Sequence, residues 1–230
     1  MAPRGRPRTF DREQALRSAM EVFRARGYDG ATLEELQAAM GGIAPPSFYA
    51  AFGSKDQLFR EAVELYRTTT GERILHALDA ATARDAIGDL LRAAAAQFGD
   101  ADEPRGCLIV LGALNCTRAN KDAHDHLRGL RQQGLEIIRG RIARGVADGD
   151  VPATAPVTEM ASFYTTVLHG LAVRARDGAS RQALMAAADA AMAAWTPLVG
   201  GKRPARARRS SEDAKISKPA KTPRPARRAR

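Results

Sequence analysis

The hydrophobic residues of this chain recur every three or four positions along most of its length, which is the spacing of amphipathic helices. In the first such run, Leu16, Ala19, Met20 and Phe23 share one helical face. No segment shows the alternation with period two that a half-buried strand would show. The pattern therefore predicts an all-α protein, in which the apolar periodicity stops near residue 197.

Two capping boxes mark the starts of the first two helices. In each, a residue with a short side-chain oxygen is followed three positions later by Glu or Gln: Asp11 with Gln14, and Thr32 with Glu35. Gly27 is expected to end the first helix, because glycine adopts the left-handed conformation that often terminates helices.

A proline starts the third helix. Gly41 and Gly42 stop the second helix and turn the chain, and Pro46 lies near the first helical position, where a missing N–H costs nothing. Ser54 is expected to cap a fourth helix that runs to about residue 80. Further helices are expected at 84–98, 106–119, 122–148, 156–176 and 180–196.

The second and third helices, joined by a glycine turn, have the layout of a helix-turn-helix. Phe48 and Phe52, at positions i and i+4, should pack inward. The small residues on the opposite face would let the backbone approach a DNA major groove, and hydroxyl groups there could bind phosphate. The residues expected to be exposed are Pro46, Ser47, Tyr49, Ala50 and, just past the helix, Lys55.

Residues 6–66 closely resemble the DNA-binding domain of the tetracycline-repressor (TetR) family. The similar run is FDREQALRSAMEVFRARGYDGATLEELQAAMGGIAPPSFYAAFGSKDQLFREAVELY, with its Phe-x-x-x-Gly-Tyr ending of the first helix at Phe23, Gly27 and Tyr28. The resemblance implies an all-helical homodimer with a three-helix DNA-binding domain and a six-helix domain for ligand binding and dimerisation. It implies a ligand-responsive regulator, most simply a repressor that a small molecule or electrophile releases from a palindromic operator.

The resemblance also implies roles for individual residues. Thr32, Ser47, Tyr49 and Lys55 match phosphate contacts of the family, whereas Pro45, Pro46 and Ala50 match base-facing positions. The turn MGGIAPPS is one residue longer than the common pattern. None of the base-facing residues is Arg, Gln or Asn, so bidentate base recognition has no obvious donor here.

Four segments are expected: a basic arm at 1–10, the DNA-binding domain at 11–54, the ligand-binding and dimerisation domain at 55–199, and a basic tail at 200–230. The arm contains PRGRPR, which looks like the core of an AT-hook. Arg4, Arg6 and Arg8 could therefore enter an A·T-rich minor groove.

The net charge of +10 is concentrated in the tail, where 12 Lys or Arg residues face only 2 acidic residues. The rest of the chain is neutral, so the protein is a globular body that carries a polycation. Since a polycation attracts nucleic acid with little regard to sequence, an architectural, nucleoid-type DNA-binding protein is the main alternative function. The tail has almost no apolar residues and is expected to be disordered.

The second half of the chain should form the dimer and hold the effector. The alanine-rich helix 180–196, together with 156–176, could build a four-helix bundle across a two-fold axis, although packing within one chain would use the same residues. The pocket should lie within residues 60–175, where each candidate could equally be ordinary core. The candidate lining residues are Phe98, Cys107, Leu111, Met160, Phe163, Tyr164 and Val167.

Cys107 is a candidate sensor as well as a candidate lining residue. It is expected in the first turn of a helix beside Arg105, and both a helix N-terminus and a cation stabilise a thiolate. Some members of the family sense electrophiles or oxidants through a similar cysteine. The competing interpretation is a small buried side chain that only packs.

Several function classes find no support in the sequence. No nucleophile elbow, P-loop or dinucleotide fingerprint is present, so an enzyme is not expected. The spacing of His124 and His126 does not favour a metal site, and no cofactor is expected. Two cysteines and the absence of a long apolar run predict a cytoplasmic location without membrane spans.

Overall fold

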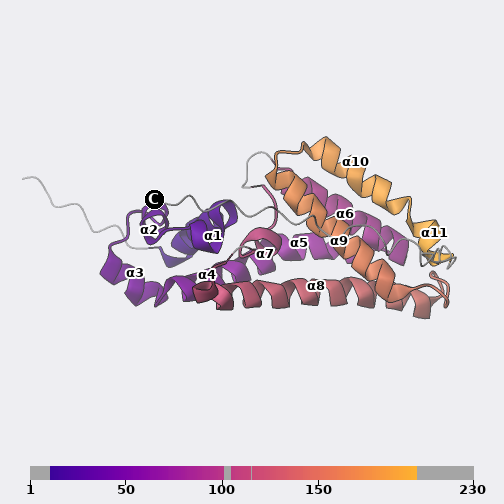
Figure 1. The fold of residues 1–230 in the computed structure, drawn as a ribbon, viewed down its shortest axis with the longest axis horizontal. Helices are drawn as coiled ribbons and strands as arrows, with labels where there is room; N and C mark the ends of the chain where they lie inside the picture. The colour runs from indigo at the N-terminus through magenta and orange to yellow at the C-terminus, as the bar shows by residue number, and fades with distance from the viewer. Residues whose placement is uncertain (1–10, 101–104, 115, 201–230) are drawn as a thin grey trace, which may run out of the picture.

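The computed structural model describes residues 11–100, 105–114 and 116–200. A small group of helices at one end of the molecule is followed by a larger bundle of longer helices (Figure 1). In the described part of the chain every regular element is helical. The arm with Arg4, Arg6 and Arg8 and the tail at 201–230 lie outside the described residues.

The small group comprises α1 (Arg12–Gly30), α2 (Leu33–Ala39) and α3 (Pro45–Phe52). The Asp11 carboxylate accepts hydrogen bonds from the first backbone N–H groups of α1. Thr32 and Glu35 form the predicted reciprocal capping box on α2, and α3 begins at a proline. At Gly27 the backbone leaves the helical region with φ +72°, so the last turn of α1 follows a kink.

One helical segment joins the two parts of the molecule. It starts as α4 (Lys55–Tyr66), passes through a π-helical turn η1 (Arg67–Gly71) and α5 (Glu72–Leu75), and ends in η2 (His76–Asp79). The Ser54 hydroxyl caps its N-terminus, as expected. In Figure 1 this segment runs from the base of α3 into the bundle.

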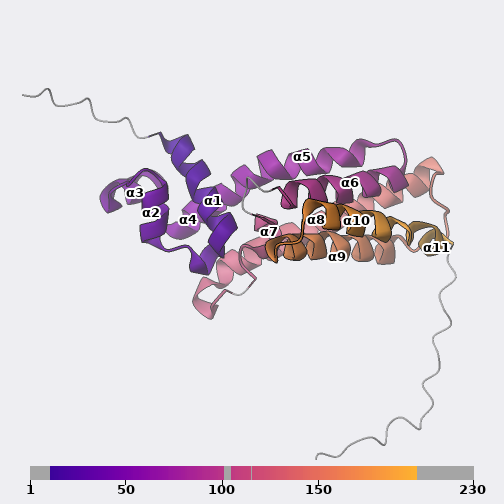
Figure 2. The same ribbon diagram turned by 90° about the horizontal axis from the view of Figure 1, so that it is seen from above.

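The bundle consists mainly of α6 (Ala83–Phe98), α8 (Lys121–Asp148), α9 (Val157–Arg176) and α10 (Arg181–Met192). Helix α10 packs on α6 and α9, and α8 packs on α9. Figure 2 shows these helices side by side at the end of the molecule away from α2 and α3. A short helix, α11 (Trp195–Val199), ends the described chain.

The helix predicted over 106–119 is wrong in its length. Only α7 (Leu108–Leu111) and the short turn η3 (Arg118–Asn120) are helical there. Gly106 has φ +90°, which prevents an earlier start. The Gly112 carbonyl accepts a hydrogen bond from the Tyr28 N–H at 2.6 Å, so this tertiary partner replaces the next helical one.

A single cluster of buried apolar side chains runs from α1 through the bundle. This arrangement confirms the predicted all-α fold class, with a helix-turn-helix domain followed by a helical domain. Among the described residues, no helix is both long enough and apolar enough to cross a membrane.

Arg141 of α8 holds the end of η2. Its side chain is buried, its Nε donates to the Leu78 carbonyl at 3.0 Å, and its Nη2 donates to the Ala80 carbonyl at 2.8 Å. These carbonyls lie where η2 ends and have no partner in a continued helix. The guanidinium therefore fixes the junction between η2 and α6.

Replacing Arg141 with Met should destabilise the protein by about 2–3 kcal/mol, because two charge-assisted hydrogen bonds are lost and the Ala80 carbonyl loses its partner, while Arg144 still reaches the Leu78 carbonyl at 3.5 Å. The measurement is urea unfolding at one fixed protein concentration. Arg139→Met is the control: Arg139 is exposed and pairs with Glu136, so its loss should change stability by less than about 1 kcal/mol. Equal losses in the two variants would contradict this role of Arg141.

Candidate DNA-binding surface and ligand cavity

Two aromatic rings anchor the third helix. Phe48 and Phe52 are buried, with ring centroids 6.1 Å apart, and the Arg12 guanidinium lies over the Phe52 ring at 4.5 Å. Gly41 and Gly42, at φ +88° and +75°, turn the chain from α2 into α3. Because one face of α3 is held in this way, its other face is left toward solvent.

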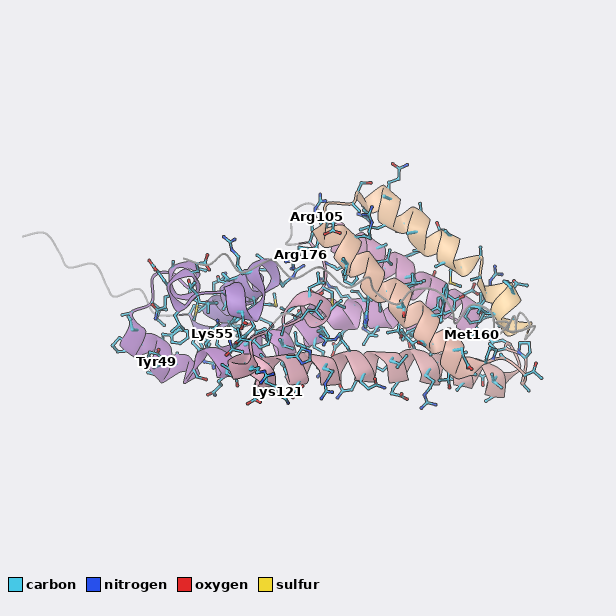
Figure 3. The ribbon with its side chains drawn as sticks, in the orientation of Figure 1. Tyr49, Lys55, Arg105, Lys121, Met160 and Arg176 are labelled. Atoms are coloured by element: carbon cyan, nitrogen blue, oxygen red, sulfur yellow. The ribbon has the colours of Figure 1, made fainter. Side chains whose placement is uncertain are left out.

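The exposed face of α3 carries the residues that the sequence placed there. Pro45, Pro46, Ser47 and Ala50 are exposed, and the Tyr49 side chain is 50% exposed. Figure 3 shows Tyr49 at the end of the molecule away from the bundle. Small side chains and two hydroxyl groups therefore form a protruding, uncharged surface.

Thr32 is exposed at the start of α2, and its hydroxyl accepts the Glu35 N–H at 3.1 Å. The Glu35 carboxylate in turn accepts the Thr32 N–H at 3.2 Å. Since the hydroxyl oxygen is used as an acceptor, its hydrogen stays available to donate to an anion such as phosphate.

Lys55 is only partly exposed, contrary to the expectation from sequence. Its ammonium group lies over the Tyr28 ring, 4.5 Å from the centroid, and burial lowers its pKa. Tyr28 itself packs edge-on against Phe59 with centroids 4.9 Å apart. Helix α4 thus places the cation on the aromatic end of α1, a cation–π contact that sequence spacing alone could not reveal.

A cavity of about 160 Å³ lies in the bundle, between the α4–α5 segment, the α7 segment, α8 and α9. Of the predicted lining residues, Phe98 and Cys107 line it. Leu111 instead lies in a shallow groove beside Gly27 and Tyr28. The floor of the cavity is largely apolar and includes Ile74, Leu90, Val110, Leu130, Ile138 and Leu168.

Helix α9 presents a different face to the cavity from the one the sequence suggested. Thr165, Leu168 and His169 line the cavity. Met160 and Tyr164 are buried in the core, where the Tyr164 ring lies 5.7 Å from Trp195. Phe163 is 37% exposed, and Val167 borders a groove between α9 and α10. The sequence analysis favoured the large apolar residues of α9, whereas the face that lines the cavity carries two polar residues, Thr165 and His169, beside Leu168.

Six polar residues that line the cavity were not predicted from the sequence: Tyr66, Arg67, Arg131, Gln133, Thr165 and His169. The Thr165 hydroxyl is buried without a hydrogen-bond partner, and the Tyr66 hydroxyl has no partner of good geometry. Arg131 donates to the Ile109 carbonyl at 2.9 Å. Burial lowers the pKa of His169, and the nearby Arg131 charge lowers it further.

The environment of Cys107 is opposite to the predicted one. The residue precedes a helix of only four residues, and burial raises the pKa of its thiol. The neighbouring Tyr66 hydroxyl favours the thiolate but does not offset burial. Arg105 points elsewhere and donates to the Ala179 carbonyl at 3.4 Å. The side chain therefore rests as a neutral thiol.

Hydrogen bonds of backbone and side chains connect the segment after α7 and the end of α9 to the last turns of α1. Besides the bond between Tyr28 and Gly112, the Asp29 carboxylate accepts from the Thr117 N–H at 2.8 Å and from the Asn120 amide at 2.6 Å. From the end of α9, Arg176 donates to the Ala25 carbonyl at 3.0 Å.

Arg176 also donates to the carbonyl oxygens of Arg105 and Arg24. Figure 3 shows Arg105 and Arg176 close together where α9 approaches α1. The Arg176 guanidinium thus connects α9 of the bundle to the segment before α7 and to α1, the first helix of the DNA-binding domain.

Two family models match this chain. Residues 15–62 match the bacterial regulatory proteins of the tetR family, and residues 83–191 match the tetracyclin repressor-like C-terminal domain. The chain therefore belongs to the TetR family, as its resemblance suggested. It is a DNA-binding transcriptional regulator, which confirms the function class predicted from the sequence.

Individual relatives agree with this assignment. The HTH-type transcriptional repressor ComR of Escherichia coli (strain K12) is 31% identical over 201 residues, which cover 85% of this chain and 94% of ComR. The repressor BdcR of the same strain is 31% identical over 186 residues, covering 80% and 88%. A cysteine mutant of the TetR-family regulator CifR, solved with a 26-bp operator, is 46% identical with a TM-score of 0.79, covering 83% of this chain and 100% of that one.

The raised pKa of Cys107 predicts slow alkylation. In a Cys116→Ser variant, which leaves Cys107 as the single thiol, iodoacetamide should react at pH 7.5 at least about tenfold more slowly with the native protein than with the urea-unfolded chain. The native rate should keep rising with pH beyond the range where an exposed thiol levels off, because less thiolate is present at each pH. A native rate that levels off below pH 8 would show a stabilised thiolate instead.

Proposed function

We propose that this chain is a repressor whose third helix, α3, enters the major groove of a palindromic operator. The observation that carries the proposal is the exposed, small-residue face of α3 above a closed aromatic core. Such a face lets the helix backbone come close to base edges. The relatives ComR and BdcR are repressors, and the CifR mutant was solved on operator DNA, which supports the same role here.

Within this proposal, the hydroxyl groups of Thr32, Ser47 and Tyr49 bind phosphates at the edges of the groove. Pro45, Pro46 and Ala50 face the bases, where they make apolar contacts with thymine methyl groups. Because these apolar contacts distinguish few base pairs, contacts with phosphates supply much of the affinity.

Lys55 contributes a further phosphate contact from the rim. Its ammonium group stacks on Tyr28, which limits the positions that the cation can take. A pre-positioned cation loses less conformational entropy when it binds phosphate. Outside the described residues, Arg4, Arg6 and Arg8 remain predicted minor-groove contacts, and the basic tail a predicted non-specific one.

The homodimer forms through α9 and α10. Phe163, Thr166, Gly170 and Val173 recur every three or four residues on α9 and are all exposed. Two large apolar side chains on one exposed stripe favour burial against another protein surface, and Gly170 permits close approach of helices. A two-fold pairing of this stripe would place two α3 helices on half-sites about 34–36 Å apart.

The bundle cavity is the effector site. Tyr66 and Ile74 line it from the segment that continues α4, and α4 begins directly after α3. The α7 segment contributes Cys107, which lies beside Tyr66, and Val110, two residues before the carbonyl of Gly112 that binds α1. A ligand that prefers one arrangement of the α4–α5 segment against the α7 segment would therefore change the position of α3.

A further contact joins the cavity to α1. The buried Arg24 of α1 lies over the Tyr66 ring, 5.4 Å from its centroid. A shift of Tyr66 on ligand binding would thus displace Arg24 and, with it, α1. Since burial keeps Cys107 neutral, we infer release by a non-covalently bound ligand in preference to an electrophile.

The family consists of transcriptional regulators, which supports a non-enzymatic role in the bacterial cytoplasm. The ratio of affinities for a selected palindrome and for random DNA distinguishes a repressor from an architectural DNA-binding protein. A repressor should prefer a selected palindrome over random DNA by about 10³-fold or more, whereas an architectural protein discriminates little. A ratio close to one at physiological salt would favour the alternative.

Substitutions on the rim of α3 separate hydrogen bonding from charge. Tyr49→Phe should weaken operator binding by about fivefold to tenfold, the usual value of one hydrogen bond, without changing the salt dependence. Lys55→Met should weaken binding and reduce the slope of log affinity against log salt by about 0.9 for each lost phosphate contact. Fluorescence anisotropy at several salt concentrations measures both.

Arg139→Gln, an exposed change on α8, serves as the control for the rim variants. Operator affinity and salt slope should match the wild type. If Tyr49→Phe and Lys55→Met also behave as wild type, the rim of α3 does not contact DNA.

A charge on the exposed stripe of α9 should break the dimer. Val173 is 42% exposed, so Val173→Glu should leave the fold of one chain intact while placing like charges against each other across a two-fold axis. Sedimentation velocity should show a monomer for this variant and a dimer for the wild type. A dimer of unchanged affinity in the variant would place the interface elsewhere.

A further inference from the structure

The cavity in the bundle has an unbalanced chemistry. Its polar lining comes from Tyr66, Arg131, Thr165 and His169, with Gln133 of α8 and the exposed Arg67, whose charge is already paired with Glu64. None of the described residues that line it is Asp or Glu. The lining therefore offers hydrogen-bond donors and positive charge but no carboxylate group. A cationic ligand would find no counter-ion there.

Two of the donors are deeply buried. Thr165 is 8% exposed and its hydroxyl has no hydrogen-bond partner, whereas Tyr66 is 1% exposed and its hydroxyl lies beside the Cys107 thiol. A buried hydroxyl without a partner loses its hydration without compensation, which destabilises the unliganded protein. A ligand oxygen that accepts from these hydroxyls would remove that penalty.

The third donor is charged. Arg131 extends from α8 to the cavity and donates to the Ile109 carbonyl through one of its terminal nitrogens. In the described part of the chain no carboxylate pairs with it, whereas Arg139, two turns further along α8, pairs with Glu136. Burial lowers the pKa of Arg131, so the charged form is held at a cost in this position. A half-buried arginine with free donors in a cavity is suited to a carboxylate.

The size of the cavity limits the rest of the ligand. At about 160 Å³ it is close to the engineered apolar cavity of about 150 Å³ that accommodates benzene. The remaining walls are Ile, Leu, Val and Phe side chains. The part of the ligand that the cavity encloses is therefore apolar and about the size of one six-membered ring.

We propose that this cavity binds a small monocarboxylate with an apolar body, whose carboxylate accepts hydrogen bonds from Arg131 and from the buried hydroxyl groups of the cavity. The inference rests on the effector site proposed above and specifies its ligand class. The ligand is recognised as an anion, and Cys107 contributes packing beside Tyr66 without forming a covalent bond.

Three nearly isosteric probes that differ in charge test the ligand class: benzoate, benzamide and benzamidinium. Isothermal titration calorimetry with the full chain should show benzoate binding at least about tenfold more tightly than benzamide, with benzamidinium weakest. Equal affinities, a preference for benzamide or benzamidinium, or no binding of any probe would overturn the proposal.

Variants of α8 test the assigned residue. Arg131→Gln should remove the preference of benzoate over benzamide, Arg131→Lys should retain most of it, and the matched control Arg139→Gln should leave it unchanged. Thr165→Val should weaken benzoate about threefold to tenfold. Circular dichroism checks that each variant is folded. If Arg131→Gln does not fold, the assignment is tested by the affinities of the three probes for the wild type and for Arg131→Lys. A preference for benzoate that survives Arg131→Gln in a folded protein would contradict the assignment.

Operator release is measured separately, by anisotropy with the DNA recovered from a binding-site selection. Benzoate that binds the cavity but leaves operator affinity unchanged would support the ligand class and contradict the effector role. Release by another compound in a protein that binds none of the three probes would have the opposite meaning: the protein is ligand-responsive, but the ligand class inferred here is wrong.

Discussion

The hydrogen bond from the Tyr28 N–H to the Gly112 carbonyl joins the DNA-binding part of the molecule to its bundle. It requires Gly27, which has φ +72° and approaches so closely that a Cβ there would lie 3.1 Å from the Gly112 carbonyl oxygen. The kink ends the regular part of α1 and exposes the Tyr28 N–H to this partner. Without this close approach, α1 and the α7 segment would lose this backbone contact, and side-chain contacts together with the α4 linkage would have to orient the DNA-binding helices.

Other contacts reinforce the same junction from different directions. Arg176 donates to the last carbonyls of α1, Asp29 accepts from the turn before α8, and Tyr28 supports Lys55 through its ring. Each of these contacts reaches across elements that are far apart in sequence. A network that is held at several points has few alternative arrangements, which would suit a DNA-binding domain that shifts between two distinct positions.

The cavity shares its walls with this junction. Tyr66 has the cavity on one side and Arg24 of α1 against its ring, while Cys107 and Val110 lie on the segment that carries Gly112. The elements that would contact a ligand are thus the elements that hold α1. A ligand in the cavity would therefore be separated from α1 by only one layer of side chains, because Tyr66 contacts both.

Local chemistry in the sequence was sufficient for much of the N-terminal part. The caps at Asp11, Thr32 and Ser54, the start of α3 at a proline, and the shared helical face of Phe48 and Phe52 depend on neighbours within four residues. These interactions are determined by spacing, so the fold class, the helix-turn-helix and the exposed face of α3 could all be predicted.

The bundle was decided by tertiary structure. The 106–119 helix was cut short by a hydrogen bond to α1, Cys107 was buried against Tyr66, and Lys55 was covered by a ring from another helix. Which face of α9 meets the cavity depended on how α8 and α10 pack against it, so Thr165 and His169 lined it while Tyr164 went into the core. Sequence periodicity identifies that a helix has an apolar face, but several faces of these alanine-rich helices are apolar enough to be buried. Only the packing of the whole bundle selects among them, because burial is a property of the partner surface as well as of the residue.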